Sequence, residues 1–124
     1  MKPNWIATGA FLAALAVMTG AFGAHGLKER LSVEEMATWQ TGVLYHALNA
    51  PGLVLFGLFD REDRGRLAPW SLLIGIVLFS GSLYLMALGG SAALGMITPL
   101  GGVLLILGWL AFAWQARRDI SARE

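Results

Sequence analysis

Four long apolar stretches, separated by short breaks, dominate the pattern of hydrophobic and polar positions along the chain. They cover residues 4–24, 41–59, 69–88 and 98–116. Each is close to the ~20 residues that an α-helix needs to cross a hydrocarbon layer about 30 Å thick. The breaks at 28–35 and 60–66 are charged, whereas the break at 89–96 is uncharged and rich in Gly, Ser and Ala. Because short links join antiparallel neighbours, the pattern predicts an all-α membrane protein, an antiparallel four-helix transmembrane bundle.

Capping signals extend these boundaries. Ser32 and Glu35 have the spacing of a capping box, in which the Ser32 hydroxyl accepts from the Glu35 amide and Glu35 reaches back to the Ser32 amide. At 1.5 Å per residue, a helix over 32–59 is about 40 Å long, so its first two turns should lie outside the hydrocarbon. Thr98-Pro99 predicts a cap and first residue for the fourth helix, and Pro69 predicts the first residue of the third. The predicted helices, in a single membrane domain over residues 1–124, are 4–24, 32–59, 69–88 and 98–116.

The basic residues predict how the bundle is oriented. With four spans, the two termini and the second break lie on one side, and they hold every Lys and Arg except Lys28 and Arg30. The positive-inside rule therefore places both termini in the cytoplasm. The aromatic residues expected near that face are Trp5, Trp70, Trp109 and Trp114.

The first apolar stretch also has features of a secretory signal. Lys2 precedes the hydrophobic run, and Ala21-Phe22-Gly23 offers small residues at a cleavage point. An uncleaved first span is favoured, because the apolar run is longer than the ~7 to 15 residues of a signal core.

Composition narrows the possible functions. With 56% hydrophobic and 14% charged residues and a mean hydropathy of +0.63, the chain is too apolar for an ordinary soluble domain. A net charge of +1 without a basic stripe predicts no nucleic-acid partner. The absence of cysteine excludes disulfides and thiolate sites. The four apolar stretches contain no charged residue, which argues against an ion pump, and no catalytic constellation or cofactor motif is found. We therefore expect no enzyme activity and no cofactor.

Small residues recur at helical spacing. The pairs are Gly9/Ala13, Ala16/Gly20, Thr19/Gly23, Ser71/Gly75 and Gly101/Gly108. In lipid, small residues allow the close backbone approach that holds helices together. We expect them to pack one bundle internally, with a homo-oligomer seam as the alternative.

Polar residues gather on one side of the second helix. Helical spacing places four residues together there: Gly42, His46, Asn49 and Leu53. Tyr45 lies beside them. An imidazole and an amide within a span need polar partners, so this side should face the bundle interior. Pro51 also releases the carbonyl of Ala47 from its helical hydrogen bond, and Asn49 or a water is expected to satisfy it.

His25 lies at the non-cytoplasmic end of the first helix, near the expected depth of His46. Three interpretations of this polar region remain open. It could form interhelical hydrogen bonds, bind a lipid headgroup, quinone or other amphiphile at the outer leaflet, or hold a metal or haem. Two histidines without a strong third ligand are a weak pattern for the last.

Several motifs carry a resemblance to a known family. GAFGAHGL (20–27), WQTGVLYHAL (39–48), FSGSLYLMAL (79–88) and ITPLGG (97–102) resemble the domain of unknown function 423 family, in its order and spacing. These are small four-span bacterial membrane proteins, with relatives resembling transmembrane protein 256 in eukaryotes. The resemblance implies a bacterial inner-membrane location and no established activity. It maps the functional surface to His25, Tyr45, His46, Asn49, Ser80, Ser82, Tyr84, Thr98 and Pro99. Many relatives carry a histidine where this chain has Asn49, which weakens the metal interpretation here.

The sequence thus predicts a non-enzymatic membrane protein with a polar pocket that opens toward the outer leaflet between the first, second and third helices. The pocket would bind a membrane lipid or other amphiphile, or the protein would act as an accessory subunit of a larger membrane complex. One alternative is a small-solute channel or transporter formed by a homo-oligomer, with residues 89–96 as a pore-side loop. The other is a haem or metal-binding redox protein.

Overall fold

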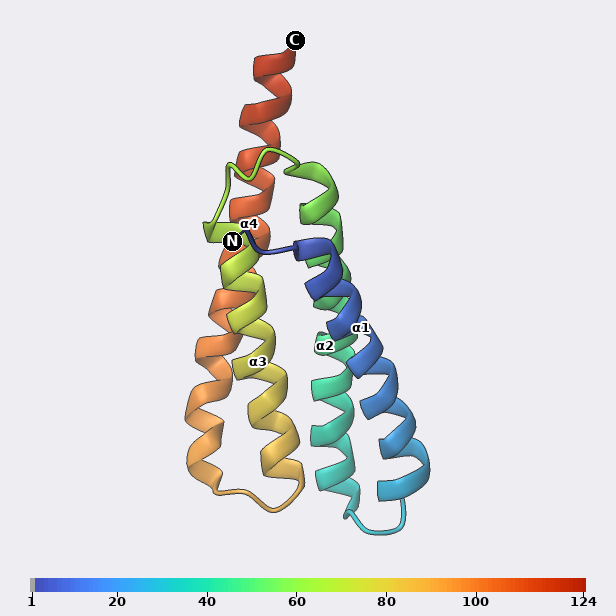
Figure 1. Cartoon of the computed structure of the whole chain (residues 1–124). Helices are drawn as coiled ribbons and strands as arrows, with labels where there is room; N and C mark the ends of the chain where they lie inside the picture. Colours follow the sequence, from blue (N-terminus) through green and yellow to red (C-terminus); the bar gives the residue numbers. More distant parts are fainter. Residues whose placement is uncertain (1) are drawn as a thin grey trace.

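The computed structural model describes residues 2–124 as four long helices joined by short links (Figure 1). The helices are α1 (Trp5–Phe22), α2 (Val33–Phe59), α3 (Leu67–Ala87) and α4 (Ile97–Arg123). A π-helical turn, η1 (Gly23–Leu27), continues α1, and a 3₁₀ helix, η2 (Ala92–Met96), precedes α4. All four long helices are apolar enough to cross a membrane. Consecutive helices run antiparallel with both termini toward the same end, so the predicted four-span fold is confirmed.

The capping box at the start of α2 is present as predicted. The Ser32 hydroxyl accepts from the Glu35 amide at 3.0 Å, and the Glu35 carboxylate accepts from the Ser32 amide at 2.9 Å. Two of the four amides left free at this helix end are thereby satisfied, which fixes where α2 begins.

The third and fourth helices begin two residues and one residue earlier than predicted. α3 begins at Leu67, so Pro69 is its third residue, and α4 begins at Ile97, so Thr98 is not its cap. The reason at α4 is that η2 runs directly into it, and Thr98 donates back to the Leu94 carbonyl at 3.4 Å. Both prolines still lie in a first helical turn, where a missing N–H is tolerated.

The fourth helix is also longer than predicted. It continues past residue 116 to Arg123 and projects beyond the other helices at the end where the termini lie (Figure 1). The prediction stopped where the hydrophobic run stopped, but the arginines and the alanine that follow are good helix formers, and no Gly or Pro interrupts them.

α2 and α3 form the centre of the bundle, and α1 and α4 lie outside them. α1 packs mainly on α2, α4 on α3, and α2 on α3, with no comparable contact between α1 and α4 among residues 2–124. Accordingly, 39% and 44% of the most apolar windows of α2 and α3 are buried, against 17% in α1 and in the η2–α4 segment. The outer helices therefore present most of their surface to lipid.

Small residues bring the helices into backbone contact. A Cβ at Gly9 of α1 would lie 2.7 Å from the Val54 amide of α2, and one at Gly108 of α4 would lie 2.8 Å from the Leu72 side chain of α3. Gly101 likewise rests on the α3 backbone. The expected intramolecular packing is confirmed at these positions. Large side chains fill the space between the helices, including those of Leu53, Phe56 and Leu72.

Gly89 makes the reversal between α3 and α4. Its φ of +98° lies in the left-handed region that glycine adopts without strain. The Gly89 amide donates to the Met86 carbonyl at 3.1 Å and the Gly90 amide to the Leu85 carbonyl at 2.8 Å. This is a Schellman motif, which ends α3 and turns the chain back toward α4.

Candidate functional site

The predicted polar side of α2 faces the interior of the bundle. Gly42, His46, Asn49 and Leu53 are all buried. The His46 and Asn49 side chains retain only 5% and 3% of their exposure. The prediction that this side of the helix faces the bundle interior is confirmed.

Tyr84 of α3 connects three helices through its hydroxyl. The oxygen lies 2.9 Å from Nδ1 of His46 in α2 and 3.2 Å from Oγ1 of Thr19 in α1. Thr19 in turn donates to the Ala16 carbonyl at 3.0 Å. The indole N–H of Trp39 donates to the Thr19 backbone carbonyl at 2.9 Å, and the Trp39 ring lies 4.6 Å from the Tyr84 ring. We call Thr19, Tyr84 and His46 the three-helix chain.

The direction of the hydrogen bonds in the three-helix chain depends on the His46 tautomer, because the Tyr84 hydroxyl can donate its one proton either to Thr19 or to Nδ1 of His46. Nε2 of His46 is buried without a hydrogen-bond partner. The backbone of Leu12 in α1 lies near it but makes no hydrogen bond of ordinary geometry. The three-helix chain therefore ends at an unpaired imidazole nitrogen that faces α1.

Asn49 makes a second connection, between α2 and α4. Its Nδ2 donates to the Tyr45 carbonyl at 2.7 Å, and its Oδ1 accepts from the Trp109 indole at 2.7 Å. Asn49 thus serves the carbonyl of Tyr45, not that of Ala47 as the sequence suggested. The prediction that Trp109 lies at the cytoplasmic interface is also wrong, because its indole is held within the span by Asn49.

The predicted serines join α3 to its neighbours. Ser80 donates to the Gly42 carbonyl of α2 at 2.7 Å, and Ser82 lies 2.5 Å from the Thr98 hydroxyl of α4. Each contact ties a side chain of the central helix to another helix within the membrane. These two bonds satisfy polar groups that lipid could not.

His25 lies apart from the other polar residues. It is in η1, its side chain is exposed, and within residues 2–124 no hydrogen bond or ring contact joins it to His46. In the same part of the chain, no group of three His, Cys, Asp or Glu side chains could hold a metal ion. The predicted site residues therefore do not form one cluster. They lie in the three-helix chain, in the Asn49 connection, in the separate contacts of Ser80 and of Ser82 with Thr98, and, for His25, apart from all of these.

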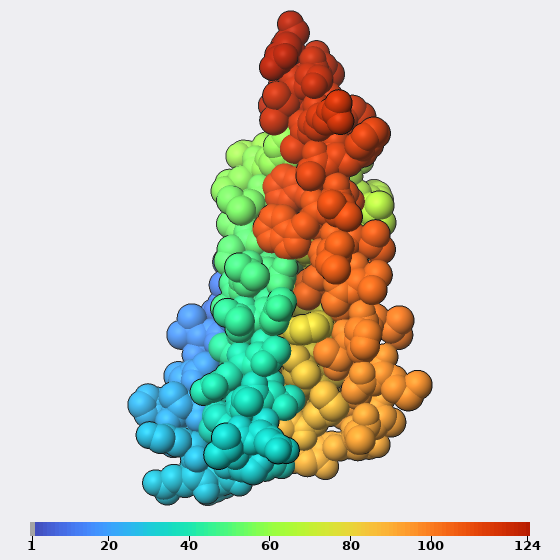
Figure 2. All heavy atoms as spheres, turned by 180° about the vertical axis from the view of Figure 1, so that it is seen from behind, coloured from blue at the N-terminus to red at the C-terminus, as the bar shows by residue number. Residues whose placement is uncertain are grey.

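A groove opens beside Asn49, between α2 and α4. Its volume is about 380 Å³, and its lining residues are Tyr45, Leu48, Asn49, Phe79, Gly102, Leu105, Ile106 and Trp109. In Figure 2, α3 is visible between α2 and α4 on this face of the molecule. The pocket expected from the sequence lay between the first three helices, whereas this groove uses α2, α3 and α4.

Sequence reasoning missed Thr19, Trp39 and Trp109 as polar partners. The sequence identified Thr19 only as a small packing residue, and Trp39 only as the first residue of the motif at 39–48. The threonine hydroxyl and the two indole N–H groups are donors that need an acceptor when buried. This requirement could have identified the three residues as polar partners from the sequence.

Four antiparallel spans with polar side chains bonded between helices define a multi-pass helical membrane protein. The chain belongs to the family described as "Protein of unknown function (DUF423)", whose model matches residues 19–102. The earlier resemblance is thereby confirmed.

Curated relatives support this assignment. The chain is 47% identical over 108 residues to a UPF0382 membrane protein of Staphylococcus epidermidis, covering 86% of this chain and 88% of the relative. It is 44% identical over 110 residues to the UPF0382 membrane protein YwdK of Bacillus subtilis, covering 86% and 89%. A UPF0382 membrane protein of Haemophilus influenzae matches 98% of this chain at 37% identity, over 99% of its own length. No solved structure matches. The protein is accordingly a multi-pass protein of the bacterial inner membrane.

Proposed function

We propose that the protein is a non-enzymatic membrane protein that binds a lipid of the outer leaflet in the groove between α2 and α4. The observation that carries the proposal is the groove itself, with about 380 Å³ of space walled mainly by apolar side chains. This volume falls in the range of small-molecule sites, which are mostly apolar with a few placed polar groups.

The depth of the groove fits an acyl chain that enters from the outer leaflet. Gly102 and Trp109 lie about 8 Å and about 18 Å beyond the first residue of α4, at 1.5 Å per residue. With the termini in the cytoplasm, the groove runs from near the outer headgroups toward the middle of the bilayer. Leu105 and Ile106 lie between its ends.

Tyr45 is placed to bind the polar part of this lipid. Its ring packs on Phe79 with centroids 4.8 Å apart, at the level of Gly102. Side chains on a helix lean toward its N-terminus, which for α2 is the outer end. Within residues 2–124 the Tyr45 hydroxyl has no hydrogen-bond partner, so it is free to donate to a lipid ester carbonyl. Asn49 and Trp109, already bonded to each other, form a fixed inner end.

The proposal is tested by filling the groove. Gly102→Leu adds a side chain to the groove wall, whereas Gly81→Leu adds the same side chain on α3 where no atom lies within 4 Å of a Cβ. The proteins are extracted in a polymer that retains native lipid, and bound lipid is counted by mass spectrometry. Wild type and Gly81→Leu should retain the same number of phospholipids, and Gly102→Leu should retain fewer, because only the α2–α4 groove is filled. Tyr45→Phe should weaken retention about fivefold, the worth of one hydrogen bond near 1 kcal/mol.

Other outcomes would replace the proposal. Equal lipid content in Gly102→Leu and Gly81→Leu would refute it, and a retained quinone in place of phospholipid would change the occupant. A stoichiometric protein in the same extract, lost from Gly102→Leu, would indicate an accessory role. A solute channel would have to form between copies, because Leu53, Phe56 and Leu72 fill the centre of one copy without exposure.

A further inference from the structure

A second cleft lies at the opposite end of the bundle, between α4 and the link that joins α2 to α3. Its volume is about 430 Å³. We call it the basic cleft, because the charged residues that line it are three arginines, Arg64, Arg66 and Arg118. It shares no lining residue with the α2–α4 groove.

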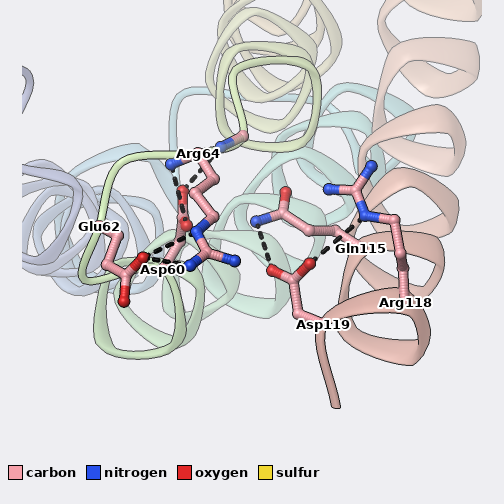
Figure 3. A network of polar contacts seen from close by, with 7 residues as sticks. Asp60, Glu62, Arg64, Gln115, Arg118 and Asp119 are labelled. Carbon is pink, nitrogen blue, oxygen red and sulfur yellow. Dashed lines mark hydrogen bonds and ion pairs between the residues drawn. The ribbon is translucent and has the colours of Figure 1, made fainter. Parts of the chain in front are cut away.

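The link is fixed in place by its own hydrogen bonds. One Asp60 carboxylate oxygen accepts from the Arg64 amide at 3.1 Å, and the other accepts from the Gly65 amide at 2.9 Å. Gly65 rests directly on the Gln115 side chain of α4, which leaves no room for a Cβ. Figure 3 shows Gln115 pointing from α4 toward this link. The two walls of the basic cleft are therefore in direct contact at Gly65 and Gln115.

Buried polar groups support the α4 wall. Gln115 and Asp119 are only 6% and 7% exposed, and the Gln115 amide nitrogen lies 3.5 Å from an Asp119 oxygen. The other Asp119 oxygen accepts from Nε of Arg118 at 3.3 Å (Figure 3). This contact positions the Arg118 guanidinium at the edge of the cleft and leaves its remaining N–H groups for another acceptor.

The arginines have free capacity to bind an anion. Arg64 is paired with Glu62, but both side chains are more than half exposed, and such pairs contribute little. Within residues 2–124, Arg66 has neither an ion pair nor a side-chain hydrogen bond. Arg66 also precedes α3, whose N-terminus has no side-chain cap. Uncapped helix amides add to the attraction for a negative group.

Below the arginines the cleft becomes apolar. Leu107, Leu110 and Trp114 line it along α4 and are exposed. From Leu107 to Arg118 the helix rises about 16 Å, at 1.5 Å per residue. Positive charge thus lies at the aqueous end, a tryptophan at the interface and leucines in the hydrocarbon. This order matches a phosphate headgroup followed by an acyl chain, and basic clefts between helices on the cytoplasmic side suit anionic lipid.

We propose that the basic cleft binds an anionic phospholipid of the cytoplasmic leaflet, with the phosphate held by Arg66 and Arg118. The test uses the full chain in neutral detergent, titrated with phosphatidylglycerol or phosphatidylcholine, with bound lipid counted by native mass spectrometry. Wild type should prefer phosphatidylglycerol. Arg66→Gln should weaken this binding about fivefold, and Arg66→Gln with Arg118→Gln about 30-fold, at the roughly 1 kcal/mol expected for each arginine near a lipid phosphate.

A matched control separates the site from general charge. Arg61→Gln with Arg123→Gln removes the same two charges at exposed positions outside the cleft and should change binding less than about twofold. Equal losses in the two double variants, or no preference of wild type for phosphatidylglycerol, would overturn the proposal. Displacement of the lipid by excess inorganic phosphate would also overturn it, in favour of a free-phosphate site. Gly102→Leu should leave phosphatidylglycerol binding intact, so failure at one site is distinguishable from failure at the other.

Discussion

Tyr84→Phe tests the three-helix chain most directly, because it removes one oxygen and leaves the ring in place. That oxygen contacts His46 at 2.9 Å and Thr19 at 3.2 Å. Side-chain hydrogen bonds between membrane helices average about 0.6 kcal/mol and reach about 1.7 kcal/mol. Two such bonds give an expected loss of about 1 to 2 kcal/mol. The upper half of this range is favoured, since Nε2 of His46 already has no partner and the substitution leaves the buried imidazole with none.

The measurement is the free energy of unfolding in mixed micelles, by denaturant titration or steric trapping. The other tyrosine provides the control: Tyr45→Phe removes a hydroxyl that bonds to nothing within the described chain, so it should cost less than about 0.5 kcal/mol. A double-mutant cycle between Tyr84→Phe and Thr19→Val should return a coupling of about 0.6 kcal/mol. If Tyr84→Phe costs no more than Tyr45→Phe, or if the coupling is zero, the chain does not stabilise the fold.

Two further predictions concern packing and orientation. Gly101→Ala places a methyl group against the α3 backbone and should lower the free energy of unfolding by about 1 to 3 kcal/mol. Gly81→Ala places the same group in open space and should not lower it. Comparable values for the two variants would contradict the close approach of α3 and α4. Because the chain has no cysteine, Ser91→Cys and Ser121→Cys can be labelled singly in intact cells. A membrane-impermeant maleimide should modify Ser91→Cys and spare Ser121→Cys, and the reverse pattern would invert the assigned topology.

The span count and the α2 cap were predictable because they depend on local signals. The length of each apolar run can be compared directly with the thickness of the membrane. The capping box depends only on the four residues from Ser32 to Glu35. The inward side of α2 was predictable for a similar reason. His46 and Asn49 share a helical face, and lipid offers them no hydrogen bond.

The partners of these groups could not be predicted, because they depend on how the helices are placed in three dimensions. Trp109 was assigned to the interface from its residue type, yet its indole reaches Asn49 on another helix. The position of a residue in the sequence indicates its depth along the helix, but not which neighbouring helix its side chain faces. The polar end of the α4 wall of the basic cleft was missed because hydropathy ended the helix at 116, while Arg118 and the buried Asp119 lie beyond that point.

The outer placement of α1 and α4 bears on how the protein is made. α1 packs on α2 and α4 on α3, so each hairpin closes its own seam between sequence neighbours. The first hairpin has all the residues for its seam before the ribosome has translated the second. Joining the two then forms mainly the α2–α3 face, where Ser80 meets the Gly42 carbonyl and Tyr84 meets His46. The same step brings Trp109 of α4 to Asn49 of α2, and Tyr84 of α3 to Thr19 of α1. Biogenesis can therefore proceed as insertion of two hairpins followed by a single docking step.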